Sequence, residues 1–280
     1  MKKGINIWSF PAQSLKETFA LAKKAGFEGV EVALDEGAGE IRLDSTKAEL
    51  LEVKKQAEAE GIELYSLSSG LYWNYWLNSA DKAECQKARD VVKKQIETAA
   101  ILGCESILVI PGSVNAEFAA PGRVEDYCET YERSLESILA VKGEAEAAKV
   151  EIALENVWNK FLLSPLEMRD FIDKVDSPYV GSYLDIGNTL ANGYPEQWIR
   201  ALGKRIKKVH FKDYRVQAGG LHGFVDLLAG DVNWPAVTAE LAKIGYEGWV
   251  SAEMIPNYAH YTETIIYNTS NAMDSILGRK

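Results

Sequence analysis

Four polar residues stand at the ends of apolar runs in the second half of the chain. Glu155 closes "VEIALE", Asp185 closes "VGSYLD", His210 follows "IKKV", and Glu253 closes "GWVSAE". A carboxylate or an imidazole is costly to bury next to apolar residues unless it has a partner. A single residue of this kind is more often a helix cap or half of an ion pair. Four in successive runs favour a shared site.

Three carboxylates brought together in a pocket of low dielectric would repel one another. A bound divalent cation removes that repulsion. Carboxylates with a single imidazole suit Mn²⁺, Mg²⁺ or Co²⁺ better than the cysteine- and histidine-rich surroundings of structural Zn²⁺. We therefore expect Glu155, Asp185, His210 and Glu253 to bind one divalent cation. Mn²⁺ is the first choice, with Mg²⁺, Co²⁺ and Zn²⁺ as alternatives.

The elements that must position these residues alternate along the whole chain. The helix expected at 14–25 begins at Ser14 with Glu17 three residues later and ends at Gly26, as a capped helix does. The apolar runs predict strands at 4–8, 29–34, 62–68, 106–111, 150–156, 180–186, 206–212 and 248–254. Helices are expected at 14–25, 46–60, 81–102, 125–148, 164–174, 195–203, 234–243 and 260–277.

Strands that alternate with helices form a parallel sheet. Eight such units in 280 residues predict an α/β fold, a single (β/α)₈ TIM barrel domain over 1–280, with an open doubly wound sheet as the runner-up. Active sites of TIM barrels lie at the carboxyl ends of the strands. The four residues close the fifth to eighth strands, so the metal site is expected at that end of the barrel.

Composition narrows the classes of partner. The formal net charge is −10, which argues against nucleic acid and against an anionic membrane surface. Three cysteines without a CxxC pair indicate a reduced, cytoplasmic protein. The first residues have no apolar stretch of a signal peptide, and no run approaches the length of a membrane span. A small-molecule substrate is the expected partner, and the oligomeric state stays open.

Several motifs resemble those of the xylose-isomerase-like TIM barrels, a superfamily of sugar and sugar-phosphate isomerases and epimerases. They are "ALEN", "YLDIGN", "KVHFKD", "GDVNW" and "GYEGWVSAEM", all within 153–254. The resemblance spans the chain, is nearest to the ketose 3-epimerases, and assigns the metal to Glu155, Asp185, His210 and Glu253. It implies C3 epimerisation of a ketose through a metal-stabilised enediolate, with Glu155 and Glu253 as the acid/base pair.

Further residues are expected to contact the substrate. Asn188 stands where many family members have a histidine, and an amide can hydrogen-bond a sugar hydroxyl. Arg215 resembles a family arginine that contacts substrate oxygens, and His222 lies in a glycine-containing loop suited to a phosphate. Trp8 would wall the sugar pocket. Lys212 is a substrate contact or else a local partner of Asp213.

Other functions remain open at this point. The same fold supports aldose–ketose isomerases, and lyases or dehydratases of keto-sugars, keto-inositols and 3-keto glycosides. A phosphoesterase with several zinc ions would need more than the three histidines of this chain. A non-catalytic sugar-binding protein or partner subunit is the remaining alternative. The sequence does not choose the sugar or its phosphorylation.

Overall fold

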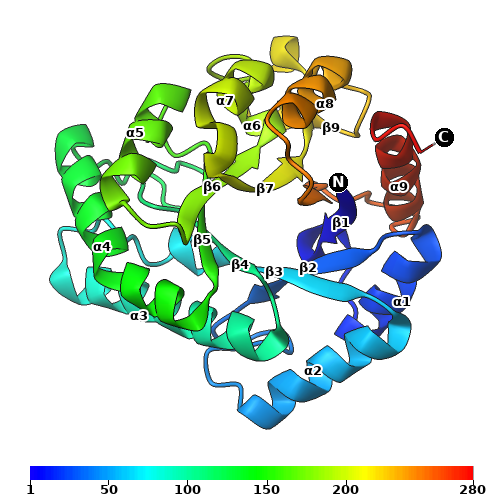
Figure 1. Ribbon diagram of the computed structural model, residues 1–280, viewed down its shortest axis with the longest axis horizontal. Helices are drawn as coiled ribbons and strands as arrows, with labels where there is room; N and C mark the ends of the chain where they lie inside the picture. Colours follow the sequence, from blue (N-terminus) through cyan, green and yellow to red (C-terminus); the bar gives the residue numbers. More distant parts are fainter. Residues whose placement is uncertain (280) are drawn as a thin grey trace.

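The computed structural model describes residues 1–279 and contains a closed ring of parallel strands surrounded by helices (Figure 1). The closed ring confirms the predicted TIM barrel and excludes the open sheet. The ring follows the order β1-β10-β7-β6-β5-β4-β3-β2. Its strands are β1 (Lys2–Asn6), β2 (Gly29–Leu34), β3 (Glu63–Ser69), β4 (Ser106–Val109), β5 (Glu151–Glu155), β6 (Val180–Asp185), β7 (Ile206–Phe211) and β10 (Trp249–Ala252).

The helices connect successive strands and agree closely with the predicted ranges. In α1 the predicted capping box is present, since Ser14 and Glu17 cap each other's backbone and Gly26 adopts the left-handed conformation. The helices that cover the ring are α1 (Leu15–Ala25), α2 (Lys47–Glu60), α3 (Lys82–Leu102), α4 (Tyr127–Ala148), α5 (Pro165–Val175), α7 (Pro195–Leu202), α8 (Trp234–Lys243) and α9 (Thr264–Ile276). A short helix, α6 (Ile186–Thr189), directly follows β6.

The register of the strands brings their carboxyl ends to one level. Asp185 on β6 is paired with His210 on β7, and Glu155 on β5 is paired with Tyr183 on β6. Ser251 on β10 is paired with His210, so Glu253 lies just beyond the end of its strand. The topology therefore places the four predicted residues on four adjacent strands or directly after them.

The opposite end of the barrel is filled by aromatic side chains. The rings of Tyr65 and Trp249 stack with centroids 4.1 Å apart. Gly29 makes room for them, because a Cβ at this position would lie 2.7 Å from Trp249 Cη2. The interior is thus packed where the strands begin, and space for a ligand lies at the other end.

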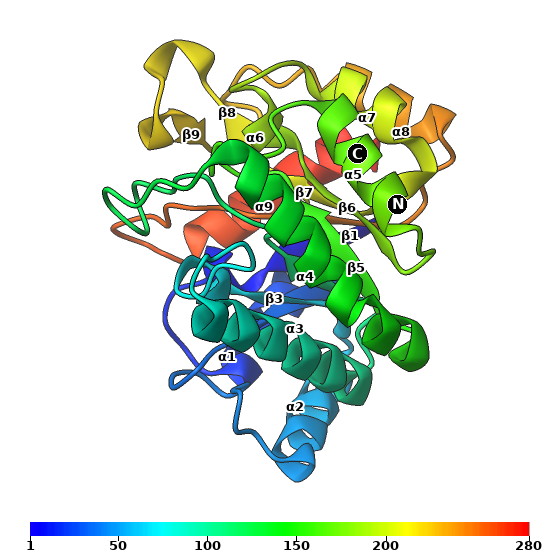
Figure 2. The same ribbon diagram turned by 90° about the vertical axis from the view of Figure 1, so that its left-hand side faces the viewer.

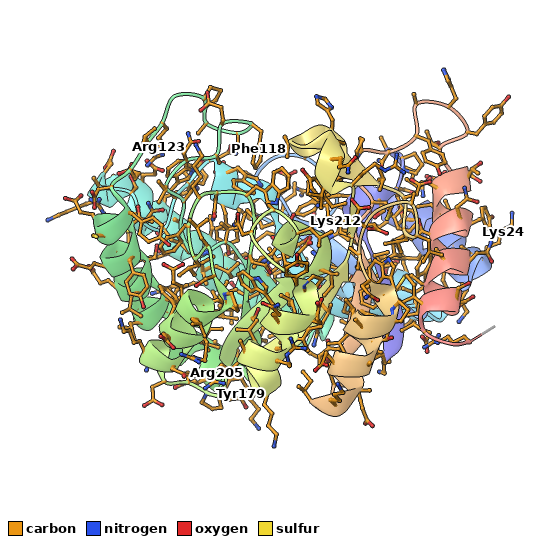
Figure 3. The ribbon with its side chains drawn as sticks, turned by 90° about the horizontal axis from the view of Figure 1, so that it is seen from above. Lys24, Phe118, Arg123, Tyr179, Arg205 and Lys212 are labelled. Atoms are coloured by element: carbon orange, nitrogen blue, oxygen red, sulfur yellow. The ribbon has the colours of Figure 1, made fainter. Side chains whose placement is uncertain are left out.

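Long connections rise from the carboxyl ends of the strands (Figures 2 and 3). The segment 213–231 contains a two-stranded sheet, β8 (Asp213–Tyr214) and β9 (Phe224–Val225). In Figure 3, Phe118 lies among these connections, while Tyr179 and Arg205 lie at the end where strands begin. Over residues 1–279, the helices are all too short or too polar to cross a membrane.

Candidate metal centre and sugar pocket

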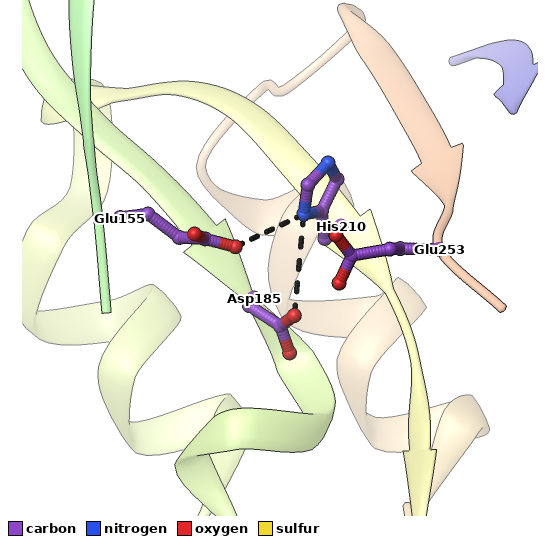
Figure 4. Close-up of side chains that lie close together, drawn as sticks. All are labelled: Glu155, Asp185, His210 and Glu253. Atoms are coloured by element: carbon purple, nitrogen blue, oxygen red, sulfur yellow. Dashed lines mark hydrogen bonds and ion pairs between the residues drawn. The ribbon is translucent and has the colours of Figure 1, made fainter. Parts of the chain in front are cut away.

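Glu155, Asp185, His210 and Glu253 converge inside the mouth of the barrel (Figure 4). One ligand atom from each residue lies within 4.8 Å of the others, and all four residues are buried. Glu155 Oε1 lies 3.1 Å from His210 Nδ1, and Asp185 Oδ2 lies 4.0 Å from the same nitrogen. Three carboxylates and one imidazole so close together form a donor set that suits a hard or borderline divalent cation.

The two carboxylate oxygens of Asp185 have different surroundings. Oδ1 accepts a hydrogen bond of 2.7 Å from the backbone N–H of Asn188 and thereby caps α6. Oδ2 is buried and has no hydrogen-bond partner within the described residues. A buried carboxylate oxygen without a partner is unfavourable. It faces His210 Nδ1, where a cation between these groups would supply the missing interaction.

Gly187 is required for close packing of two segments rather than for a sharp turn of the backbone. Its φ is not positive, and it lies within α6. A Cβ at this position would approach the carbonyl oxygen of Lys212 to 2.8 Å. Glycine therefore allows the segment after β6 to pack closely against the segment after β7, which keeps Asp185 beside His210.

His210 is held from both sides of its ring. Nδ1 faces Glu155, and Nε2 lies 2.8 Å from Oε1 of Glu31. Glu31 lies on β2, on the far side of the ring of strands, and is fully buried. A carboxylate that accepts a hydrogen bond from one imidazole nitrogen leaves the other nitrogen available as a ligand and fixes the ring's orientation.

Glu31 is itself fixed by two further side chains. Asn6 donates to Oε1 at 2.5 Å, and the hydroxyl of Tyr183 donates to Oε2 at 2.6 Å. The predictions made from the sequence do not include Glu31, although the run "GVEVAL" has a carboxylate in the middle of a strand whose neighbours are apolar. That signal is present, but the partner of Glu31 is distant in sequence.

Lys212 belongs to the same cluster. Its Nζ lies 2.5 Å from Oε2 of Glu253 and 3.9 Å from Oδ2 of Asp185. The predicted local pair with Asp213 is wrong. Asp213 points into the connection 213–231, where it accepts hydrogen bonds from three backbone N–H groups and an indole, those of Tyr214, Leu228, Val232 and Trp234.

The electrostatic environment differs between the two glutamates. Burial raises the pKa of Glu155 to about 7, against the opposing effect of His210. Burial also disfavours ionisation of Glu253, but the Lys212 ammonium outweighs it and lowers the pKa of that carboxyl. Burial raises the pKa of Asp185 to about 6, although Lys212 opposes this. Without a cation, Glu155 and Asp185 are thus costly to ionise.

The surroundings of the His210 imidazole favour its charged form, whereas those of Glu155 and Asp185 favour the neutral form. Burial favours the neutral ring of His210, but the carboxylates of Glu31 and Glu253 outweigh it and raise its pKa well above the ordinary value. A cationic imidazole would partly neutralise the cluster in the absence of metal. A divalent cation among the same groups would replace that proton.

A cavity of about 700 Å³ opens above this cluster. Glu155 and Glu253 line it, as do four of the predicted substrate contacts: Trp8, Asn188, Lys212 and His222. Arg215 is not among the lining residues; it is exposed, and its guanidinium donates to the carbonyl of Ala229 at 2.6 Å. Trp8 lies in a short 3₁₀ helix just beyond β1 rather than at the end of that strand.

Asn188 lines the cavity beside β6, and hydrogen bonds to neighbouring residues hold it in place. Asn156 exchanges two hydrogen bonds of 2.9 Å with the backbone of Asp185. Asn188 donates to the carbonyl of Asn156 at 2.9 Å, and the indole of Trp158 donates to the carbonyl of Asn188. These bonds fix the predicted substrate contact Asn188 next to the cluster. Asn156 is a further residue that was not predicted from the sequence.

Comparison with known proteins decides the family. The model of the xylose isomerase-like TIM barrel family matches residues 19–268. This chain belongs to that family. It is 28% identical to a protein named "Putative L-ribulose-5-phosphate 3-epimerase SgbU" of Escherichia coli (strain K12), over 86% of this chain and 84% of that protein. The sequence-based prediction of an isomerase that acts on carbohydrates agrees with the named activity of this relative.

Solved structures share the whole fold. D-Psicose 3-epimerase with D-tagatose from Clostridium cellulolyticum H10 has a TM-score of 0.79 at 21% identity, with 99% of both chains covered. The IOLI protein with a binding zinc atom has a TM-score of 0.82 at 20% identity, covering 100% of this chain and 99% of that one. Identities this low support the fold, while the chemistry of the site must be argued from its own residues.

Proposed function

We propose that this family member is a divalent-cation-dependent epimerase that inverts C3 of a ketose. Glu155, Asp185, His210 and Glu253 would hold the cation, with Mn²⁺ as the first choice. The observation that carries this proposal is the buried Oδ2 of Asp185, which lacks a hydrogen-bond partner and faces the other three residues. The donor set fits an oxygen-preferring divalent cation.

The reaction needs an acidified C–H bond and a proton carrier on each face of the substrate. When bound, the cation would act as a Lewis acid that polarises the substrate carbonyl and makes the neighbouring C3 proton more acidic. Glu155 ends β5 and Glu253 directly follows β10, with β6 and β7 between these two strands. One carboxylate would remove the C3 proton, and the other would return a proton to the opposite face. Each transfer is worth about 10²–10⁴-fold in rate.

The other residues of the cavity would bind and orient the sugar. Asn188 offers amide hydrogen bonds next to the cluster, and Lys212 offers an ammonium between Asp185 and Glu253. Trp8 and His222 also line the cavity. Arg215, which does not line the cavity, would have to move toward it to contact a substrate. We further propose that the protein acts in the cytoplasm.

The test is exchange of the C3 proton in deuterated water. The Mn²⁺-loaded protein is incubated with a panel of ketoses, and the products are followed by NMR. Deuterium at C3 together with the C3 epimer supports the proposal. Loss of a substituent from the carbon next to the exchanged position would instead favour the lyase alternative.

Glu253→Gln keeps the size of the side chain but removes the proton acceptor. It should abolish C3 exchange while the circular dichroism spectrum stays unchanged. Glu58→Gln, on the exposed surface of α2, is the matched control and should exchange at the wild-type rate. Full exchange activity in Glu253→Gln would contradict the assignment of Glu253.

A further inference from the structure

The cavity above the cluster changes character from its floor to its rim. The floor carries the charged groups of Glu155, Lys212 and Glu253. The rim is apolar and exposed: Phe118, Leu221 and Ile255 line the cavity with exposed fractions of 49%, 45% and 42%. Apolar side chains that stay exposed around a cavity mark a place where a ligand supplies the missing contacts.

The cavity is larger than a single sugar requires. A monosaccharide displaces about six water molecules, or roughly 180 Å³ at about 30 Å³ for each water. The cavity measures about 700 Å³. A ketose whose carbonyl end lies at the cluster would therefore leave most of the space beneath the rim unfilled.

Aromatic side chains from separate segments surround that space. They are Trp8, Trp73, Phe118, Trp158 and Phe224. Trp73 and Phe118 come from the connections after β3 and β4, and their rings meet edge to face with centroids 4.9 Å apart. A sugar or aryl ring presents flat C–H or π faces that such side chains bind well. An open-chain phosphorylated tail presents no comparable face.

The charges that line the cavity do not suit a phosphate. Among the described residues, the lining contains no arginine, and its cationic or titratable nitrogen groups belong to Lys212 and His222. Lys212 is already paired with Glu253 at the floor. His222 is exposed, and Asp35 contributes a further carboxylate to the lining. A phosphate dianion in this space would be desolvated without a fixed cationic partner.

From size, aromatic lining and charge together, we infer that the substrate is an uncharged ketose or keto-sugar that carries a second ring. The ketose end lies at the cluster, and the second ring, a glycosyl or aryl group, fills the space beside Trp73 and beneath the rim. This inference rests on the proposed function for the placement of the carbonyl. It departs from the phosphorylated substrate in the name of the curated relative.

Three ligands that share one ketose test the inference. They are D-fructose, D-fructose 6-phosphate and isomaltulose, in which O6 carries a hydrogen, a phosphate or a glucosyl group. Binding to the Mn²⁺-loaded protein is measured by calorimetry and by quenching of tryptophan fluorescence. We expect isomaltulose to bind about tenfold or more tightly than fructose 6-phosphate, because only the glucosyl ring gains apolar contacts in the aromatic space. Equal or tighter binding of fructose 6-phosphate, or binding of none of the three, would overturn the inference.

Variants assign the effect to the aromatic space. Phe118→Ala and Trp73→Ala should each lower the affinity for isomaltulose by about fivefold and leave the affinity for fructose unchanged. Tyr261→Ala, which removes a ring that is 87% exposed and does not line the cavity, is the control. Leu221→Arg should improve the binding of fructose 6-phosphate alone, since it adds the missing cation. If the affinities for fructose and isomaltulose fell by the same factor, the role of the rim would be contradicted.

The same samples separate this inference from the proposed function. C3 exchange is recorded for all three ligands in deuterated water. If isomaltulose binds best but no ligand exchanges its C3 proton, the epimerase proposal fails and the substrate class stands. If exchange occurs but fructose 6-phosphate is preferred, the substrate class fails and the epimerase proposal stands.

Discussion

Nε2 of His210 lies 2.8 Å from Oε1 of Glu31, across the interior of the barrel from the strand that carries the histidine. The contact turns Nδ1 toward Glu155, Asp185 and Glu253. Glu31 is therefore a positioning residue: it would not touch the cation, but it sets the orientation and the donor strength of the imidazole that does.

Replacing Glu31 should lower the affinity for the metal, although all four expected metal ligands remain in place. In Glu31→Gln the negative charge beside Nε2 is lost, and we expect the Mn²⁺ affinity to fall by about 10- to 100-fold. Calorimetric titration of the metal-free protein measures this change. The visible spectrum of the Co²⁺-loaded variant should also shift, which a purely structural role of Glu31 would not produce.

A nearby glutamate provides the control for this experiment. Glu28 lies just before β2 but faces the surface, where it pairs with Arg279. Glu28→Gln should bind Mn²⁺ with wild-type affinity. Unchanged affinity and an unchanged Co²⁺ spectrum in Glu31→Gln would show that His210 is oriented without this contact.

Metal binding should depend on pH in a defined direction. In the metal-free protein, burial raises the pKa of Glu155 to about 7 and that of Asp185 to about 6. Carboxyl groups with raised pKa values keep their protons to higher pH, so protons compete with the cation as the pH falls. Each displaced proton lowers the apparent affinity by up to about tenfold per pH unit.

The measurement is a Mn²⁺ titration from about pH 8 down to about pH 6, repeated in buffers with different heats of ionisation. The heat differences give the number of protons released on binding. A pH-independent affinity with no proton release would mean that Glu155 and Asp185 are already ionised, and His210 already neutral, in the metal-free protein.

The sequence was sufficient to predict the barrel and the four converging residues. The alternation of strands and helices is a local pattern, and helix caps such as Ser14 with Glu17 are read within a few residues. Once the chain is known to form a parallel barrel, residues at strand ends such as Asp185 and His210 must share one end. Short-range signals thus specified both the fold and the position of the site.

Contacts across the barrel could not be predicted in the same way. Glu31 and His210 are 179 positions apart, and nothing local distinguishes a carboxylate that faces the interior of a barrel from one that faces a helix. Lys212 pairs with Glu253, which is 41 positions away. Asp213 is the nearer candidate in the sequence, but its carboxylate accepts hydrogen bonds from groups of the connection that follows β7. To predict which of two partners a side chain contacts, one must know where that side chain points in the folded barrel.

Lys212 should stabilise the cluster when no cation is bound. Its ammonium lies 2.5 Å from Glu253 and 3.9 Å from Asp185. Lys212→Met leaves these buried carboxylates without that partner, and breaking a buried pair in this way costs about 3–5 kcal/mol. The metal-free variant should therefore melt at a lower temperature than the wild type. Because Mn²⁺ would replace the lost charge, its addition should raise the melting temperature more in the variant.

Lys208→Met is the control for this comparison. Lys208 is also buried and pairs with Glu105, whose side chain is 53% exposed, but this pair lies outside the cluster. The variant should lose stability, yet its increase in melting temperature with Mn²⁺ should equal that of the wild type. An equal Mn²⁺ response in Lys212→Met and Lys208→Met would contradict the role of Lys212 in the cluster.

Asp213 should control the part of the cavity wall that the connection 213–231 contributes. The side chain is fully buried and accepts hydrogen bonds from Tyr214, Leu228, Val232 and Trp234. Asp213→Asn replaces one acceptor oxygen by a donor, so two of these groups lose their partner at a cost of about 1–3 kcal/mol each. Since the same connection carries Leu221, His222 and Phe224 into the cavity, KM should rise more than kcat falls.

The control is Asp231→Asn. Asp231 is an exposed aspartate of the same connection that accepts a hydrogen bond from the backbone of Val216, and its replacement should change neither constant. Hydrogen exchange should show faster exchange of the amide of either Leu228 or Val232, whichever bonded the replaced oxygen, in Asp213→Asn alone. Unchanged protection of both amides would contradict the role of Asp213.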